Sequence, residues 1–592
     1  MDAAVLHKSE RLPTMKRFFS VACLLAATLT VQAHLSYAQT AQVGDVKVQA
    51  VPDAPPASFD EVVDRAIAQE TRLLTVLRGL HPIAETYIQN MVKDADFGAV
   101  PKTDHYFLGK IDLSKGVTTA SFLPKSSRRT RAFQAFTQLF ALKYLPRGFA
   151  QMMLIDGTTF DRGHYDFELV RREFLGDVRT YVVMVKPKKG AGKGRFVGRL
   201  WIEDKDFAIV RFNGTYSSES RQEMYMHFDS WRQNVGPDLW VPSLIYTEES
   251  NMKLDRFRKV TFKAVTHVWG YGAQHEEGSA EFTSIQVDLP TVQDKSEQAA
   301  DNSPLESKRA WERQGEDNIL HRMEKAAILA PSGDVEKVLE TVVNNLIITN
   351  KLDISPEVRV RVILTSPLET FTVGHTVVIS RGLLDTLPDE PSLAAILAHE
   401  LAHISLGQVI DTRFAFSDRV MFDDEETLKR FRFVRKQSEE DDANKEAVRL
   451  LETSPYKDKM TQAGLYLKAL GAQSDRLPSL IKALFGSQLA QKNNVTRLSD
   501  LIQRSPELQR KRVEQIAALP LGGRTKLDPW TDRLQMARFR AITPQSALEK
   551  MPFEITPVYL HLTRQAEGGG IAEQSPANAD GSPAATKAPL RP

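Results

Sequence analysis

The chain has 592 residues, of which 42% are hydrophobic and 26% are charged, a composition typical of soluble globular proteins with two or three domains. Its formal net charge of +2 argues against nucleic acid as the main partner, because such partners select strongly basic surfaces. The one cysteine, Cys23, lies in an apolar segment near the N-terminus. The mature chain is therefore expected to contain neither a disulfide nor a thiolate metal ligand.

Residues 1–38 are predicted to be a removable signal peptide. The basic pair Lys16-Arg17 precedes the apolar segment Phe18–Val31, which has the length of a signal-peptide core and is short for a membrane span. Cleavage is expected after Ser36–Ala38, with Val31–Ala33 as the alternative site, and an N-terminal membrane anchor is the alternative to cleavage. Export without disulfides indicates a bacterial periplasm or the exterior, with no membrane span after signal removal.

The next part of the chain changes from helical to β-type patterning. Residues 39–57 are predicted to be a flexible lead-in, and residues 58–103 a helical segment, because apolar residues recur there at helical spacing. From 104 to 287, short apolar runs such as Tyr181–Val185 and Phe196–Ile202 alternate with turn residues. Many strands joined by short turns predict an antiparallel β-rich accessory domain.

One hairpin pattern in this region, Gly198–Glu203 followed by Phe207–Arg211, resembles the curved half-barrels of periplasmic lipoprotein-carrier proteins. The resemblance implies a groove for a lipid or another hydrophobic ligand. A structural sheet, or one on which a substrate docks, is the alternative that we favour, since aromatic residues are also expected wherever one face of a sheet is covered.

Helical patterning dominates the remainder. Residues 288–312 are polar and contain prolines, so we expect a linker there, and the Gly-, Ala-, Ser- and Pro-rich tail 566–592 is expected to be disordered. Between them, residues 313–565 are predicted to form a mainly helical domain with a small sheet that includes Val358–Leu364 and Thr376–Ser380. The predicted fold class is therefore α+β.

The run His399-Glu400-Leu401-Ala402-His403 spells HExxH within a helix expected from Asp389 to about Val409. Residues four apart on a helix share one face, so both imidazoles can reach one zinc ion, while Glu400 serves as the general base that activates a zinc-bound water. The rest of this helix is apolar, and three buried polar side chains would be costly without a metal or other partners.

A zinc site of this kind needs a third protein ligand, and no histidine closely follows His403. A carboxylate is therefore required, and the acidic run Glu439–Asp442 opens a later predicted helix.

These residues carry a resemblance to a known family. Gly382-Leu383-Leu384 ahead of Ala395–His403 resembles the zinc endopeptidases typified by HtpX and the CAAX prenyl endopeptidases, over roughly residues 318–520. The resemblance implies a gluzincin-type metallopeptidase domain that binds one Zn²⁺ per chain. The second motif of that family, Glu-x-x-Ala-Asp-x-x-Ala, is matched by Glu440, Ala443 and Ala447.

The second motif implies that Glu440 is the third metal ligand beside His399 and His403, with Glu439 as the fallback. Asn444 stands where the family has Asp, and we expect it to orient a ligating histidine through the other ring nitrogen. A further departure is Ser505-Pro506, where the family often has His-Pro.

Three further parts of the sequence are candidates for lining the cleft. The strand Thr376–Ser380 is expected to pair with an extended peptide as an edge strand, and His375 beside it is a candidate cleft residue, although a lone loop histidine is more often incidental. The aromatic segment Asp411–Gln437 is expected either to cover the cleft or to pack in the core.

The sequence thus predicts an exported zinc endopeptidase that hydrolyses peptide bonds in envelope or secreted proteins, as in protein quality control. Its expected partners are protein or peptide substrates, with a hydrophobic ligand or a docked substrate on the β-rich domain. The alternative is a periplasmic chaperone or lipid- or lipoprotein-binding protein whose metal site is regulatory or vestigial.

Overall fold

The structure is a computed structural model. It describes residues 56–94, 98–114, 118–121, 146–156, 159–192, 194–217, 226–236, 238–253, 259–271, 304–408, 415, 430–491, 494–505, 525–528, 530, 533–536 and 553–564. The chain divides into two units, 1–57 and 58–592, and the fold below belongs to the second. The predicted signal peptide 1–38, nearly all of the lead-in and the tail 566–592 lie outside the described residues. None of the described helices combines the length and apolar character needed to span a bilayer.

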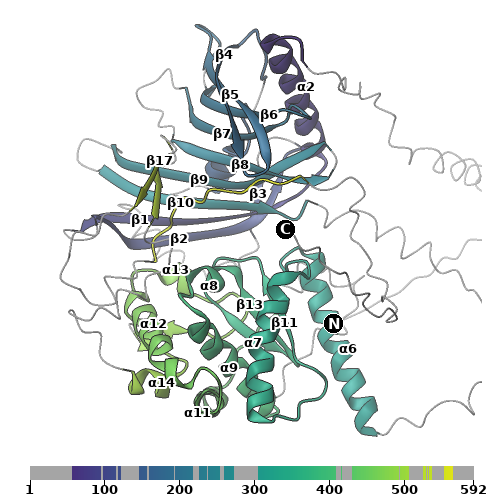
Figure 1. Cartoon of the computed structure of the whole chain (residues 1–592), viewed down its shortest axis with the longest axis vertical. Helices are drawn as coiled ribbons and strands as arrows, with labels where there is room; N and C mark the ends of the chain where they lie inside the picture. Colours follow the sequence, from purple (N-terminus) through teal and green to yellow (C-terminus); the bar gives the residue numbers. More distant parts are fainter. Residues whose placement is uncertain are drawn as a thin grey trace, which may run out of the picture. The chain divides into compact units, whose positions relative to one another are not determined.

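A large antiparallel sheet forms the N-terminal part of the second unit and confirms the predicted β-rich region (Figure 1). Its ten strands follow the order β3-β2-β1-β10-β9-β8-β7-β6-β5-β4. The strands are β1 Ile83–Asp94, β2 Gly98–Asp112, β3 Thr118–Ser121, β4 Tyr165–Leu175, β5 Val178–Pro187, β6 Phe196–Glu203, β7 Ile209–Tyr216, β8 Phe228–Gly236, β9 Leu239–Lys253 and β10 Lys259–Trp269.

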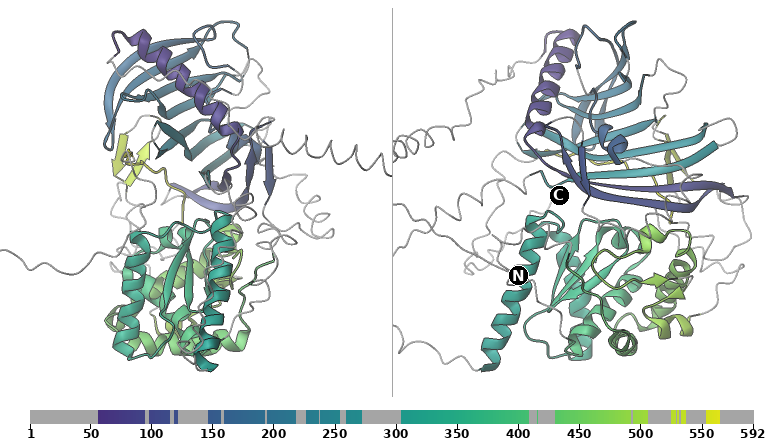
Figure 2. Two further views of the ribbon diagram at one scale, coloured as in Figure 1. Left: turned by 90° about the vertical axis from the view of Figure 1, so that its right-hand side faces the viewer. Right: turned by 180° about the vertical axis from the view of Figure 1, so that it is seen from behind.

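One face of this sheet carries helix α2, Phe59–Arg78, which crosses the strands in Figure 2. The Ser58 side chain accepts a hydrogen bond from the Glu61 N–H and caps the helix. Near the middle of the helix, Glu70 forms a buried ion pair with Arg232 of β8, with a shortest distance of 2.7 Å. The shorter helix α4, Pro146–Gln151, packs on the same sheet.

Part of the expected helical segment 58–103 is wrong, because residues 83–94 and 98–103 are strand. The helix ends at Arg78, shortly before Pro82. Beyond it, β1 pairs with β2 on one side and with β10 on the other. The buried hydroxyls of Thr86 and Thr266, 2.8 Å apart, join β1 to β10. Such pairing with a distant strand overrides local helical spacing.

The C-terminal part is mainly helical with a small sheet, as the α+β prediction required. Its elements are α6 Pro304–Lys325, α7 Asp334–Asn350, β11 Arg359–Ile363, β12 Thr370–Val373, β13 Thr376–Ser380, α8 Arg381–Thr386, α9 Glu390–Ser405, α11 Gln437–Glu452, η3 Lys457–Lys459, α12 Met460–Gln473, α13 Pro478–Ile481, β14 Ala490–Gln491, β15 Asn494–Val495, α14 Ser499–Arg504, β16 Thr525–Asp528 and β17 Arg533–Met536. Helix α6 begins at Pro304, inside the segment 288–312 that we expected to be a linker. Residues 288–303 lie outside the described ranges.

The small sheet has the order β11-β13-β12, with β13 parallel to β11 and antiparallel to β12. The strand Thr376–Ser380 is therefore central and fully paired, and the expectation that it pairs with substrate as an edge strand is wrong. Gly374, with φ 58°, lies in the tight turn between β12 and β13. A Cβ there would stand 1.9 Å from the Glu316 carboxylate, so the turn requires glycine.

Two buried carboxylates of the large sheet bind the helical part. Glu85 of β1 accepts hydrogen bonds from the Ser366 hydroxyl at 2.7 Å and from Arg381 at 2.6 Å. Asp104 of β2 accepts the backbone N–H groups of Ser479 and Leu480 at 2.9 and 2.8 Å. Since buried charges are stable only with such partners, these contacts couple the sheet to the helical part.

We predict that Glu85→Ala destabilises the protein by about 3–5 kcal/mol, because it leaves Arg381 without its partner in a largely buried junction. Urea unfolding followed by circular dichroism measures the change. The control Asp60→Ala removes a carboxylate that is 77% exposed and should change stability by less than about 1 kcal/mol. Equal losses in the two variants would contradict the coupling role of Glu85.

Candidate metal centre

Helix α9 places the HExxH residues in the interior. The Asp389 side chain accepts the Ser392 N–H at 2.9 Å, and Pro391 occupies the first turn, so the helix begins with a capping residue and a proline that needs no donor. Almost the whole helix is buried, because apolar side chains lie around its full circumference. His399, Glu400 and His403 are each at most 1% exposed.

Helix α11 supplies the carboxylate, and its N-terminus distinguishes Glu440 from Glu439. The Glu439 side chain accepts the Lys436 N–H at 3.1 Å and caps the helix. Glu440, the next residue, is 6% exposed and faces α9. Ala443 and Ala447, which are fully buried, follow at helical spacing and allow the two helices to pack closely.

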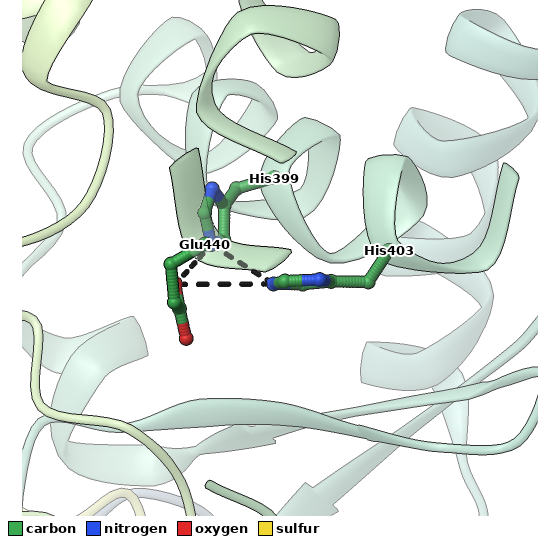
Figure 3. A group of neighbouring side chains, drawn as sticks. All are labelled: His399, His403 and Glu440. Carbon is green, nitrogen blue, oxygen red and sulfur yellow. Dashed lines mark hydrogen bonds and ion pairs between the residues drawn. The ribbon is translucent and has the colours of Figure 1, made fainter. Parts of the chain in front are cut away.

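Three side chains converge between these helices (Figure 3). His399 Nε2 lies 3.0 Å from Glu440 Oε2 and 3.2 Å from His403 Nε2, and His403 Nε2 lies 3.9 Å from the same carboxylate oxygen. Zinc–nitrogen bonds of about 2.0–2.1 Å at tetrahedral angles place two ligand nitrogens roughly 3.3 Å apart. The spacing and chemistry of these donors therefore fit one zinc ion.

His403 is held by a partner that sequence reasoning missed. The chain turns at Gly407, with φ 64°, and brings the Gln408 side chain back to the ring. His403 donates its Nδ1–H to Gln408 Oε1 at 2.5 Å, which leaves Nε2 as the electron-pair donor on the side of Glu440. Burial is the main reason that the pKa of His403 falls to about 4, so this ring is neutral, as a metal ligand must be.

Arg497 is the second residue that the sequence did not reveal. Its guanidinium donates to Glu400 Oε1 at 2.7 Å and to the Thr370 carbonyl at 3.1 Å, and its Nε lies 3.2 Å from Glu440 Oε2. Burial alone would raise the pKa of Glu440, but Arg497 and His399 outweigh it and hold the pKa well below its usual range. Arg497 thus balances the charge of two buried carboxylates that lie beside the histidines.

Asn444 has a different contact from the one expected. Its side-chain oxygen accepts the backbone N–H of Leu498, the residue after Arg497, and Leu498 adopts a left-handed conformation with φ 56°. Within the described part of the chain, Nδ1 of His399 has no hydrogen-bond partner. Asn444 therefore fixes the bend that presents Arg497, because an amide oxygen suffices to hold one strained backbone N–H.

The other sequence candidates lie elsewhere. His375 in the β12–β13 turn faces Glu316, with Nδ1 3.2 Å from its carboxylate. Ser505 donates to the Leu501 carbonyl at 2.8 Å and packs on Gly464, so it serves helix packing. Most of Asp411–Gln437 lies outside the described residues. Within the described part, Phe433 stacks on Phe371 in the core, with ring centres 4.8 Å apart.

Comparisons with known proteins agree with the resemblance noted for the C-terminal half. Residues 333–419 match the family described as Peptidase family M48, which confirms the predicted resemblance to zinc peptidases. The match includes the HExxH run and ends before Glu440. No curated protein matches the chain.

Among solved structures, the crystal structure of a LolA superfamily protein from Nitrosomonas europaea is similar at 12% identity. The alignment covers 36% of this chain and 93% of that one, with a TM-score of 0.19.

We predict that Arg497→Met destabilises the metal-free protein by about 3–5 kcal/mol, because two buried carboxylates lose their cation. Saturating zinc should recover part of this loss, since the metal adds positive charge at the same place and binds only the folded state. Urea unfolding with a chelator and with zinc measures both effects.

Arg449→Met is the matched control for Arg497→Met. The Arg449 side chain is 52% exposed and pairs with Glu446, so its loss should change stability by less than about 1 kcal/mol. A loss at Arg497 no larger than at Arg449 would contradict the charge-balancing role.

Proposed function

We propose that this protein, whose residues 333–419 match peptidase family M48, is an exported zinc endopeptidase. One observation supports it above all. His399, His403 and Glu440 bring donor atoms within 4.8 Å of one another in the interior, with Glu400 on the same helix turn. A purely structural metal site would not need an additional carboxylate at the position of Glu400.

The chemistry follows from the side chains around this centre. A zinc ion, when bound by His399, His403 and Glu440, supplies a Lewis acid that polarises water and a peptide carbonyl. Glu400 takes a proton from the attacking water at its carboxylate and passes it to the leaving amine. Arg497 holds one oxygen of that carboxylate through its bond to Oε1, so the other oxygen is left to exchange the proton.

The proposed substrates are peptide bonds in envelope or secreted proteins. This part of the proposal rests on the N-terminal sequence, in which the apolar segment Phe18–Val31 follows a basic pair. The M48 match supports peptide substrates in general. We place this cleavage in periplasmic protein quality control, as the resemblance to the zinc endopeptidases implies.

We predict that Glu400→Gln retains stoichiometric zinc and loses about 10²–10⁴-fold in the rate of casein cleavage, because the amide cannot accept the water proton. Zinc content by atomic absorption and release of labelled casein fragments are measured on the same samples. Glu439→Gln is the control, since Glu439 caps α11 rather than facing the histidines, and it should keep activity. A wild-type protein that neither contains zinc nor cleaves casein would contradict the proposal.

We further predict that Gln408→Leu weakens zinc binding about 10–100-fold, because His403 loses the acceptor that orients its ring. Competition with a chromophoric chelator gives the zinc dissociation constant without reference to activity. Gln437→Leu is the matched control, as its amide bonds the exposed Asp441, away from the histidines. Unchanged zinc affinity in Gln408→Leu would show that this contact does not position the ligand.

A further inference from the structure

A later part of the chain covers one face of the large sheet. Residues 553–564 form an extended segment without helix or strand. They contact the sheet on the face opposite α4. Neighbouring residues of β10 establish the two faces, since Phe262 packs edge-on against Phe149 of α4 while Lys263 forms an ion pair with Glu554.

At the start of this segment, a side chain of the sheet forms hydrogen bonds with the backbone. Gln89 of β1 is fully buried, and its amide donates to the Phe553 carbonyl at 2.6 Å and accepts the Ile555 N–H at 2.7 Å. A side-chain amide that bonds both a carbonyl and an N–H of an extended chain imitates an adjoining strand. Recognition of this kind depends on the backbone and tolerates many sequences.

The end of the segment is held by a glycine turn. The Asp177 N–H, in the turn between β4 and β5, donates to the Leu562 carbonyl at 2.9 Å. Gly176 beside it has φ 67°, and a Cβ there would lie 2.6 Å from the Leu562 nitrogen. Leu562 itself is 4% exposed among the side chains of the sheet. The absence of a side chain at Gly176 therefore allows the backbone of the segment to lie close to this turn.

The middle of the segment lies over a cation–aromatic stack. The guanidinium of Arg211 lies 4.3 Å from the ring centre of Trp201 and 4.4 Å from that of Trp231. Two hydrogen bonds of 2.8 Å each join it to Asp229. Tyr559 meets Trp231 edge-on at 5.3 Å. Because Arg211 has its counter-ion within the sheet, this platform does not depend on the segment for its charge balance.

Ion pairs hold the segment near both ends, where Glu554 pairs with Lys263 and Arg564 pairs with Glu203. Ile555 and Leu562 are its buried side chains, whereas Val558 and Tyr559 are 44% and 46% exposed. A surface that holds an extended, half-exposed segment through its backbone, two aliphatic anchors and an ion pair near each end has the properties of a peptide-binding site.

We propose that this face of the sheet binds extended, unfolded polypeptide, and that residues 553–564 are an internal ligand that such a polypeptide displaces. The fitting partner presents two aliphatic side chains seven positions apart, with an acidic residue before the first to meet Lys263. That the partner is also a substrate rests on the proposed endopeptidase function, whereas the binding site does not.

The test uses the full chain with Glu400→Gln, so that no probe is cleaved, and a fluorescent peptide with the sequence of residues 553–564. Leu562→Asp should release the internal segment, because it places a charge among apolar side chains. Since a tethered segment competes at an effective concentration of about a millimolar, this release should tighten probe binding, measured by anisotropy, at least about tenfold.

Two glycine substitutions, each combined with Leu562→Asp, test whether the fluorescent peptide binds at the glycine turn. Gly176→Ala places a methyl group against the bound backbone and should abolish the gain. Gly190→Ala is the matched control, since Gly190 has φ 84° but nothing within 4 Å of its position, so it carries the same backbone strain without the contact. Circular dichroism and urea unfolding verify that each variant is folded.

The outcomes decide the proposal. Tight binding by Leu562→Asp that survives Gly190→Ala and is lost with Gly176→Ala supports it. A folded Leu562→Asp protein that binds the probe no better than its parent would show that the segment is a fixed structural strap. Equal binding of a scrambled peptide with the same composition would show nonspecific adhesion, and would also overturn the proposal.

Discussion

The balance of charge inside a dry interior is the constraint on which the rest of the structure depends. Helix α9 is apolar around its circumference and carries His399, Glu400 and His403 into the core. Burial of ionised groups without partners would cost more free energy than a protein of this size has to lose. The arrangement is stable because Arg497 bonds Glu400 and pairs with Glu440 while the histidines face the latter. Elements as distant as α11 and the bend before α14 are therefore held against α9.

The same constraint explains why the large sheet is more than an attached module. Glu85 and Asp104 are buried carboxylates on β1 and β2, and their partners Arg381, Ser479 and Leu480 belong to the helical part. Tyr87 and Tyr246 of the sheet lie in the same hydrophobic cluster as the residues of α9. A displacement of the sheet would therefore strain the helix that carries the HExxH residues, because densely packed interiors transmit strain.

How much of the fold and of the site the sequence reveals depends on how far apart in sequence the interacting residues lie. The HExxH helix was predictable because its caps, its apolar positions and its polar triplet all lie within one short stretch. The convergence of Glu440 with His399 agrees with the motif that carried the resemblance, and the capping contact with Lys436 shows why Glu439 does not converge with them. Gln408 and Arg497 gave no local signal, since one is placed by a turn and the other by a left-handed bend. The strand β1 was not predicted for a related reason, because its partners in β10 are far away in sequence.

The strand order has a consequence for the time at which the protein becomes complete. Because β1 pairs with β10, Ile83 lies opposite Trp269, so the first hairpin keeps a bare edge until the ribosome has passed β10. The core around α9 then still lacks Ile555, which joins it from near the end of the described chain. A chain that stops before β10 would leave β1 with an unpaired edge, which is open to pairing with another chain.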